Sequence, residues 1–200
     1  MQTLLIASTN PGKLREFQTI LQGLGVKLVL PADIGVHLHV EEDGADYYEN
    51  ALKKAKAYCQ ASGLITLADD SGLEVNALDG APGLHSARYS PKPGATDADR
   101  REYLLEKLAH FPQPWPAHFH CTLVIAIPDG EHCRFEGNCY GEVIPQERGE
   151  HGFGYDPIFQ LRGRAETMAE LPEEEKNRIS HRGLATLAAI PTLRDILKME

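Results

Sequence analysis

Short apolar runs and helically spaced apolar residues alternate along the first third of the chain. Residues 4–7 and 26–30 are short apolar runs, which are typical of buried strands. Between them, apolar residues recur at helical spacing over residues 14–24. A capping-box pattern then predicts a helix over residues 46–62.

The rest of the chain repeats these signals and adds a hairpin. A strand is predicted over residues 64–68, followed directly by the polar segment 69–72 and a second short strand at 73–77. Two long segments flanking the Asp129-Gly130 turn predict a β-hairpin. The other predicted segments are a helix at 96–110, hairpin strands at 118–127 and 133–144, a glycine-rich loop at 149–154, and a helical C-terminal part broken at Pro172 and Pro191.

The order of these elements predicts the fold class. Strands that alternate with helices early, followed by a hairpin, indicate an α/β fold with a mixed sheet. A chain of 200 residues buries enough surface for one stable domain. The proline-containing stretch 111–116 is a candidate divider between two lobes, but we expect residues 1–200 to form a single domain.

Composition narrows the functional classes. The formal net charge of −9 argues against non-specific nucleic-acid binding, which depends on neutralising phosphates with basic residues. Four cysteines occur without a C-x-x-C pair, so neither a zinc knuckle nor a redox motif is indicated. The N-terminus lacks a basic leader, and no apolar stretch approaches the ~20 residues of a membrane span. We therefore expect a cytoplasmic protein that binds neither nucleic acid nor a membrane.

Five polar segments carry candidate chemistry, and the first links a predicted strand to a predicted helix. It reads Ser8-Thr9-Asn10-Pro11-Gly12-Lys13. Free N–H groups and the dipole at such a helix start favour an anion such as phosphate. The segment is not a P-loop, because Ala7 replaces the first glycine and Leu14 replaces the Ser/Thr. An ordinary capping turn is the alternative interpretation.

Acidic residues gather around the start of the second predicted helix, with one lysine among them. Such a cluster can supply oxygen ligands to Mg²⁺, which prefers few carboxylates and several waters. A solvated acidic face is the alternative. The charged residues of this segment are Glu41, Glu42, Asp43, Glu49 and Lys53.

The third segment, Asp69-Asp70-Ser71-Gly72, is the strongest signal. It directly follows a predicted buried strand, and in open α/β sheets ligands bind beyond the carboxyl ends of the strands. Two adjacent carboxylates there repel each other unless they share a cation or a proton. Mg²⁺ would relieve this repulsion, activate a bound water and offset phosphate charge. A tight turn is the alternative.

Two segments nearer the C-terminus suit a nucleobase. Residues 152–157 set glycines beside aromatic rings, which fits a base-stacking platform, with a packed loop as the alternative. Lys176 precedes the segment 180–183, in which Ser180 can cap a helix and Arg182 offers a forked set of donors. A capped surface helix with solvated charges is the alternative.

A possible metal motif, His118-Phe119-His120-Cys121, is interpreted as structural. Strand alternation puts the two histidines on one face and Phe119 and Cys121 on the other, which separates the ligand types. No C-x-x-C partner accompanies them to complete a zinc site.

The order of the polar segments resembles the inosine/xanthosine triphosphate pyrophosphatase family. The similarity runs from the first strand to the last helices, and the Asp-Asp-Ser-Gly and Ser-His-Arg-Gly blocks are its most specific parts. The matching segments are residues 8–13, 48–51, 68–75, 83–89, 152–157 and 180–183.

This resemblance implies an ITPase-like α/β fold, with a long twisted mixed sheet flanked by helices and two lobes with the active-site cleft between them. It also implies a homodimer, a Mg²⁺ requirement and a substrate range of ITP, dITP and XTP. Hydrolysis of these triphosphates to the monophosphate and pyrophosphate would keep deaminated purines out of DNA and RNA.

Individual roles follow from the same resemblance. It places Mg²⁺ on Glu41 and Asp70, with Glu42 or Asp43 as alternatives to Glu41. Asp70 is also implied to accept the proton of the attacking water. The residues implied to bind substrate are Ser8, Thr9, Asn10, Pro11, Gly12, Lys13, Lys53, Ser71, Phe153, Gly154, Tyr155, Asp156, Lys176, His181 and Arg182.

Base preference has a partial explanation. Lys176 and Arg182 are donors that match the 6-keto acceptor of hypoxanthine and xanthine, whereas adenine presents an amino donor there. Guanine shares the 6-keto group, so this match does not separate it from hypoxanthine. Two alternatives stay open: a related nucleotide pyrophosphatase with another base preference, and a nucleotide-binding sensor without catalysis.

Overall fold

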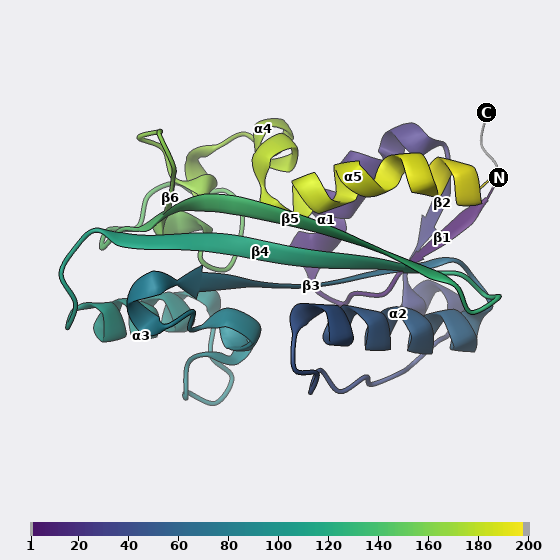
Figure 1. Cartoon of the computed structure of the whole chain (residues 1–200), viewed down its shortest axis with the longest axis horizontal. Helices are drawn as coiled ribbons and strands as arrows, with labels where there is room; N and C mark the ends of the chain where they lie inside the picture. The colour runs from purple at the N-terminus through teal and green to yellow at the C-terminus, as the bar shows by residue number, and fades with distance from the viewer. Residues whose placement is uncertain (1, 198–200) are drawn as a thin grey trace. The chain divides into compact units, whose positions relative to one another are not determined.

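The computed structural model describes residues 2–197 and contains a six-stranded sheet with flanking helices (Figure 1). The strand order is β2-β1-β3-β4-β5-β6, in which β1 pairs in parallel with β2 and β3, whereas β5 and β6 are antiparallel. The strands are β1 (Thr3–Ile6), β2 (Lys27–Val29), β3 (Thr66–Val75), β4 (Trp115–Ala126), β5 (His132–Val143) and β6 (Phe159–Leu161). The predicted α/β fold with a mixed sheet is confirmed.

Local sequence signals set the ends of the helices. Asp46 caps α2, since its side chain accepts a hydrogen bond from the backbone N–H of Glu49 at 2.8 Å, and Gly63 ends the helix at a φ of 68°. Among the described residues, no helix is long and apolar enough to cross a membrane. The α-helices are α1 (Pro11–Leu21), α2 (Tyr47–Ser62), α3 (Asp97–Leu108), α4 (Glu173–Ile179) and α5 (His181–Ile196). The short 3-10 helices are η1 (Gln22–Leu24), η2 (Pro31–Ile34), η3 (Asn76–Leu78), η4 (Gly83–Arg88), η5 (Asp156–Ile158) and η6 (Met168–Glu170).

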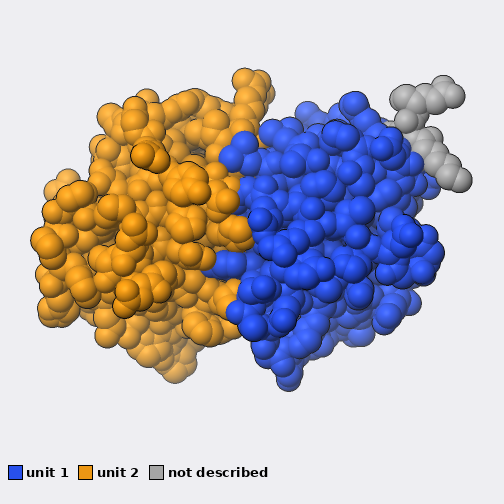
Figure 2. Space-filling view, viewed as in Figure 1, with its two compact units in different colours: residues 1–70, 121–137, 182–200 blue, residues 71–120, 138–181 orange. Residues whose placement is uncertain are grey.

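The chain separates into two compact units, which Figure 2 shows in different colours. Unit 1 comprises Met1–Asp70, Cys121–Gly137 and Arg182–Glu200, and unit 2 comprises Ser71–His120 and Asn138–His181. The divisions fall inside β3, β4 and β5 and at the start of α5. The stretch 111–116 lies wholly within unit 2, so it does not divide the chain. The single domain with a cleft between two lobes stays a prediction.

In unit 1 helices cover both faces of the sheet. On one face Leu4 of β1 packs with Phe17 of α1 and Ala185 of α5. On the opposite face Leu5 of β1 packs with Ala51 of α2. Consecutive strand residues meet different helices because side chains alternate between the two faces of a sheet.

Unit 2 has a core of its own. Leu104 and Leu108 of α3 pack with Trp115 and Phe119 of β4 and with Phe159 of β6. The rings of Phe119 and Phe159 lie with their centroids 4.6 Å apart. The apolar face of α3 is thereby fixed on this core.

Two predicted breaks in secondary structure are wrong. β3 runs without interruption from Thr66 to Val75, so the segment 69–72 lies inside a strand and does not follow one. α5 continues through Pro191, although proline removes one helical hydrogen bond. Buried Leu193 lies in the core just beyond it, so packing holds this part of the helix in place. The predicted hairpin is confirmed as β4 and β5.

Candidate functional site

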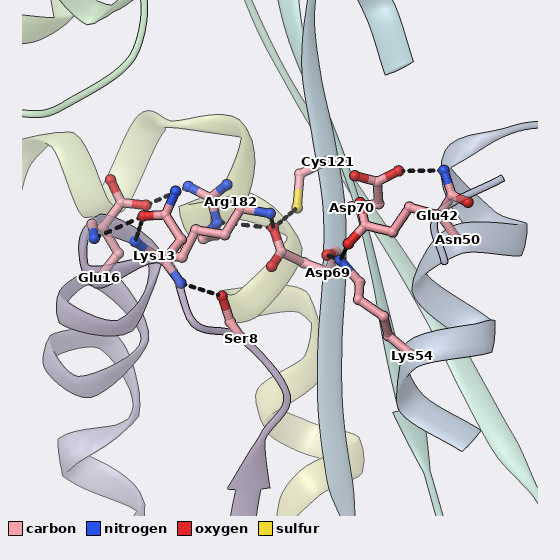
Figure 3. Close-up of polar contacts among 12 residues, drawn as sticks. Ser8, Lys13, Glu16, Glu42, Asn50, Lys54, Asp69, Asp70, Cys121 and Arg182 are labelled. Carbon is pink, nitrogen blue, oxygen red and sulfur yellow. Dashed lines mark hydrogen bonds and ion pairs between the residues drawn. The ribbon is translucent and has the colours of Figure 1, made fainter. Parts of the chain in front are cut away.

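The central strand β3 carries two adjacent aspartates whose side chains leave it on opposite faces (Figure 3). Asp69 contacts Lys13 of α1 and Arg182 of α5, whereas Asp70 contacts Asn50 of α2. The two-residue period of a strand is the reason. The expectation that these two carboxylates share one cation or proton beyond a strand end is therefore wrong.

Asp69 is the centre of a buried ion-pair network in unit 1. Asp69 is 1% exposed, and its Oδ2 lies 2.9 Å from Lys13 Nζ and 3.1 Å from Arg182 Nε. Arg182 Nη1 also donates to Glu16 Oε2 at 2.6 Å. The thiol of Cys121 lies 3.8 Å from Asp69 Oδ2. Two carboxylates are thus balanced by two basic side chains.

Charge pairing decides the protonation of this network. Burial by itself raises the pKa of Asp69, but Lys13, Arg182 and Lys54 outweigh it and hold that pKa well below its ordinary value. Burial disfavours the charged form of Arg182, yet the neighbouring carboxylates raise its pKa overall. Burial raises the pKa of the Cys121 thiol, which therefore stays protonated at neutral pH.

Asp70 faces α2 in a different environment. It is 6% exposed, and its Oδ2 accepts a hydrogen bond from Asn50 Nδ2 at 2.9 Å. Burial is the largest influence and raises the pKa of Asp70, although Lys13 and Lys54 oppose the rise. The charge of Glu42 adds to it. A buried carboxyl with a raised pKa beside lysines is a typical setting for a general base.

Lys54, and not Lys53, joins this group of residues. Lys54 is 12% exposed, and its Nζ lies 2.7 Å from the backbone carbonyl oxygen of Asp69 and 2.7 Å from Glu42 Oε1. Lys53 is 50% exposed and forms an ion pair with Asp43. The structure therefore brings the neighbour of the predicted lysine to the aspartates.

Glu42 and Glu41 differ in the same way, since only Glu42 joins the group around the aspartates. Glu42 is half-buried and pairs with Lys54. Glu41 is exposed, and its negative charge helps to raise the pKa of Lys53. The spacing of α2 carries the signal that sequence reasoning missed. Lys54 comes three residues after buried Ala51, which puts it beside the buried face of the helix.

The turn between β1 and α1 is capped by its own asparagine. Asn10 Oδ1 accepts hydrogen bonds from the backbone N–H groups of Gly12 at 2.8 Å and Lys13 at 3.2 Å, and Ser8 Oγ accepts one from Asn10 N at 3.2 Å. The capping turn is thus the local structure, and Lys13 extends from it to Asp69. The exposed members of the turn are Thr9, Asn10 and Pro11.

In unit 2 the loop after β5 folds around Asp156. Asp156 Oδ2 accepts from Phe153 N at 2.8 Å and from Lys176 Nζ at 2.6 Å. Lys176 Nζ also lies 4.9 Å from the centroid of the Phe153 ring, a cation–π contact. Tyr155 is buried and its hydroxyl donates to the carbonyl oxygen of Ser86 at 2.9 Å. The structure therefore brings these predicted residues together.

The remaining predicted residues lie in β3 and α5, at two of the positions where the chain passes from one unit to the other. α5 begins at His181, directly after Ser180. The His181 ring stacks on Phe119 in unit 2, with centroids 4.7 Å apart and 11° between the planes. Arg182, the next residue, belongs to the buried network of unit 1. Ser71 follows Asp70 in β3 and is half-buried.

The histidine-containing segment of β4 shows the predicted alternation of side chains. His118 and His120 are half-buried, whereas Phe119 and Cys121 are buried, as strand alternation predicted. His120 Nδ1 lies 2.8 Å from Asn138 Oδ1. The four cysteines of the chain are free thiols.

Glu42 and Asp70 fit a Mg²⁺ ion by the chemistry of their donors. Each offers carboxylate oxygens, and the charge of Glu42 is close enough to raise the pKa of Asp70. A cation would offset this repulsion. Within residues 2–197, no group of three or more His, Cys, Asp or Glu side chains is arranged to hold a metal. Two carboxylates completed by water are the ligand set that Mg²⁺ prefers.

Fold and site together define a mixed α/β protein with charged side chains assembled on both faces of its central strand. Residues 4–192 match the model of the Ham1 family, and the chain belongs to this family.

Several relatives are similar to this chain over nearly its whole length. A dITP/XTP pyrophosphatase from Desulfotalea psychrophila is 47% identical over 182 residues, which cover 91% of this chain and 81% of the relative. A dITP/XTP pyrophosphatase from Geobacter sulfurreducens is 46% identical over 186 residues, which cover 92% of this chain and 93% of the relative. The solved structure of a HAM1 protein from Coxiella burnetii is 39% identical, with a TM-score of 0.87 and coverage of 98% of this chain and 100% of that one.

Proposed function

We propose that this chain is a Mg²⁺-dependent nucleoside triphosphate pyrophosphatase that hydrolyses ITP, dITP and XTP to the monophosphate and pyrophosphate. The observation that carries the proposal is the high identity, over more than nine-tenths of the chain, to relatives named dITP/XTP pyrophosphatases. The buried carboxylates and lysines around β3 supply groups that such a hydrolysis needs. The activity would keep deaminated purines out of DNA and RNA.

Unit 1 is proposed to bind the triphosphate. The turn formed by residues 8–13 lies at a helix start, and its Lys13 is 15% exposed. Lys54 takes the role that the resemblance implied for Lys53, because its ammonium group lies beside the aspartates. Ser71, which follows Asp70 in β3, is proposed to add a hydroxyl. These groups offset phosphate charge and hold the chain of phosphates in place.

Asp70 is proposed to accept the proton of the attacking water. The water oxygen forms a bond to the α-phosphorus, and the bond from that phosphorus to the bridging oxygen breaks. Pyrophosphate leaves with this oxygen, and the monophosphate keeps the oxygen from water. The raised pKa of Asp70 makes it a stronger base than an exposed carboxylate.

Mg²⁺ is proposed to be held by Asp70 and Glu42, with Glu42 in place of Glu41. When bound, the ion would neutralise phosphate charge and make a coordinated water more acidic. Lys54 is positioned by Glu42, so the same carboxylate would orient a phosphate-binding lysine.

Unit 2 is proposed to bind the base. The Phe153 ring offers a surface for stacking, and Gly154 allows close approach of the backbone. Lys176, held by Asp156, supplies a donor for the 6-keto group. His181 and Tyr155 support this region from the core of unit 2. Arg182, the other residue that the resemblance implies for the base, lies in the buried network of unit 1.

Pyrophosphate release from a panel of nucleotides tests the function. We expect release from ITP, dITP and XTP with Mg²⁺ and none with EDTA. Equal rates with ATP or GTP would keep the chemistry but contradict the base preference. No release from any nucleotide would favour a sensor.

Replacing Glu42 with glutamine should raise the Mg²⁺ concentration that gives half-maximal activity by at least about tenfold, since loss of an outer-shell partner alone costs that much. Glu41→Gln is the matched control, and this exposed change should alter that concentration by less than about twofold. Titration of activity with Mg²⁺ measures both. A larger increase of this Mg²⁺ concentration in Glu41→Gln than in Glu42→Gln would instead assign the metal to Glu41.

We also propose that the protein works in the cytoplasm as a homodimer. Free thiols are consistent with a reducing compartment. Light scattering of the purified protein would measure its mass in solution, and a mass of one chain would contradict the dimer.

A further inference from the structure

The side chains of residues 152–156 hold only part of the backbone of this loop in place. Gly152 and Gly154 have φ values of 77° and 61°, a region that favours glycine. A Cβ at Gly152 would meet Asp156 Oδ2 at 2.2 Å, so the chain passes tightly over this carboxylate. Asp156 fixes the first half of the loop through Phe153 N. Gly154, at its centre, has no side chain and offers only its backbone N–H and C=O groups as hydrogen-bond partners.

Helix α3 holds Gly154 by both of its backbone polar groups. The N–H of Gly154 donates to Asp97 Oδ2 at 2.7 Å, and its carbonyl oxygen accepts from Arg101 Nη1 at 2.8 Å. Asp97 and Arg101 are four residues apart and therefore share one face of the helix. Glu147 fixes the guanidinium with two hydrogen bonds, from Nε at 2.8 Å and Nη2 at 2.9 Å.

The loop has another anchor besides these contacts with α3. Tyr155 is already buried in unit 2 and bonded to Ser86, so the loop has an apolar anchor next to Gly154. Asp97 is 40% exposed, and exposed polar contacts add little to global stability. Burial alone would raise the pKa of Asp97, but the Gly154 N–H and Arg100 outweigh it and lower that pKa. The carboxylate is therefore kept ionised and directed at the loop.

We infer that Asp97 and Arg101 are positioning residues for nucleobase recognition. By holding the N–H and C=O groups of Gly154 they fix the two peptide units on either side of its Cα, and with them the neighbouring Phe153, whose ring contacts Lys176. Both groups proposed to meet the base thus depend on the same short loop. The inference rests on the proposed function and assigns base selectivity partly to helix α3 of unit 2.

Asp97→Ala removes the acceptor, whereas Asp97→Asn removes the charge and keeps an oxygen that can accept from Gly154 N. Loss of one charge-assisted hydrogen bond should raise KM for ITP by about tenfold in Asp97→Ala. kcat should stay within about twofold, since the reacting groups are unchanged. Asp97→Asn should recover most of the affinity. Glu106→Ala, an exposed acid on α3, is the control and should leave KM unchanged.

Steady-state kinetics with ITP, XTP and GTP, with thermal unfolding of each variant, gives a clear decision. A raised KM for ITP and XTP, a smaller ITP-to-GTP ratio of kcat/KM and rescue by Asp97→Asn support the inference. An unchanged KM, or a lower unfolding temperature with unchanged KM, would assign the contact to folding alone and overturn it. Absence of pyrophosphate release by the unmodified protein would instead contradict the proposed function.

Discussion

Replacement of Asp70 with asparagine should lower kcat by a factor of about 10²–10⁴, the usual range for a lost general base. Asparagine has nearly the same shape and can still accept from Asn50, so the packing against α2 should persist. It cannot take a proton from water. Pyrophosphate release from ITP at saturating Mg²⁺ measures the effect. Turnover near that of the unmodified protein would remove Asp70 from the mechanism.

The stability of the same variant provides an independent check. Because burial raises the folded-state pKa of Asp70, ionisation of this carboxyl costs stability at pH values above its unfolded-state pKa. At pH 7 without divalent cations, Asp70→Asn should therefore unfold at the same or a higher temperature. Asp43→Asn, at an exposed acid paired with Lys53, should keep full activity. A strongly destabilised Asp70→Asn variant would show that its lost activity reflects the fold.

Replacement of Arg182 with methionine should lower the free energy of unfolding by about 3–5 kcal/mol at neutral pH, the usual cost of breaking a buried ion pair. The change removes the ion pairs of Arg182 with Asp69 and Glu16, which stay buried, and it leaves Lys13 at 2.9 Å from Asp69 Oδ2. Urea unfolding of the two proteins measures the difference. Arg194→Met, on the exposed side of α5, is the control and should cost less than about 1 kcal/mol.

The pH dependence of this difference tests its electrostatic origin. The pKa of Asp69 lies below its ordinary value, so its pairing contributes stability above the unfolded-state pKa and loses it as pH falls toward the folded-state pKa. The gap between the unmodified protein and Arg182→Met should therefore shrink as pH falls below about 4. An equal gap at pH 7 and in acid would point to packing as the cause.

Local pattern was sufficient for most secondary-structure elements. The capping of α2 by Asp46 and its end at Gly63 are decided by neighbouring backbone groups, and so they could be predicted. The predicted interruption of β3 is wrong because residues 69–72, considered without their tertiary contacts, have the polar composition of a turn. Contacts on both faces of the strand, from Lys13, Arg182 and Asn50, stabilise the extended backbone there.

The family, the α/β class and the segments that carry chemistry could be predicted from the amino-acid sequence, because they depend on residue order and short-range periodicity. Which individual side chains meet depends on the folded chain. Asp69 and Arg182 are 113 residues apart in sequence, and no local rule pairs them. The choice of Lys54 over Lys53 follows from the packing of α2 on β3, and Glu42 is distinguished from Glu41 by its ion pair with Lys54. A helix turns by about 100° per residue, so a shift of one position moves a side chain from the aspartates to solvent.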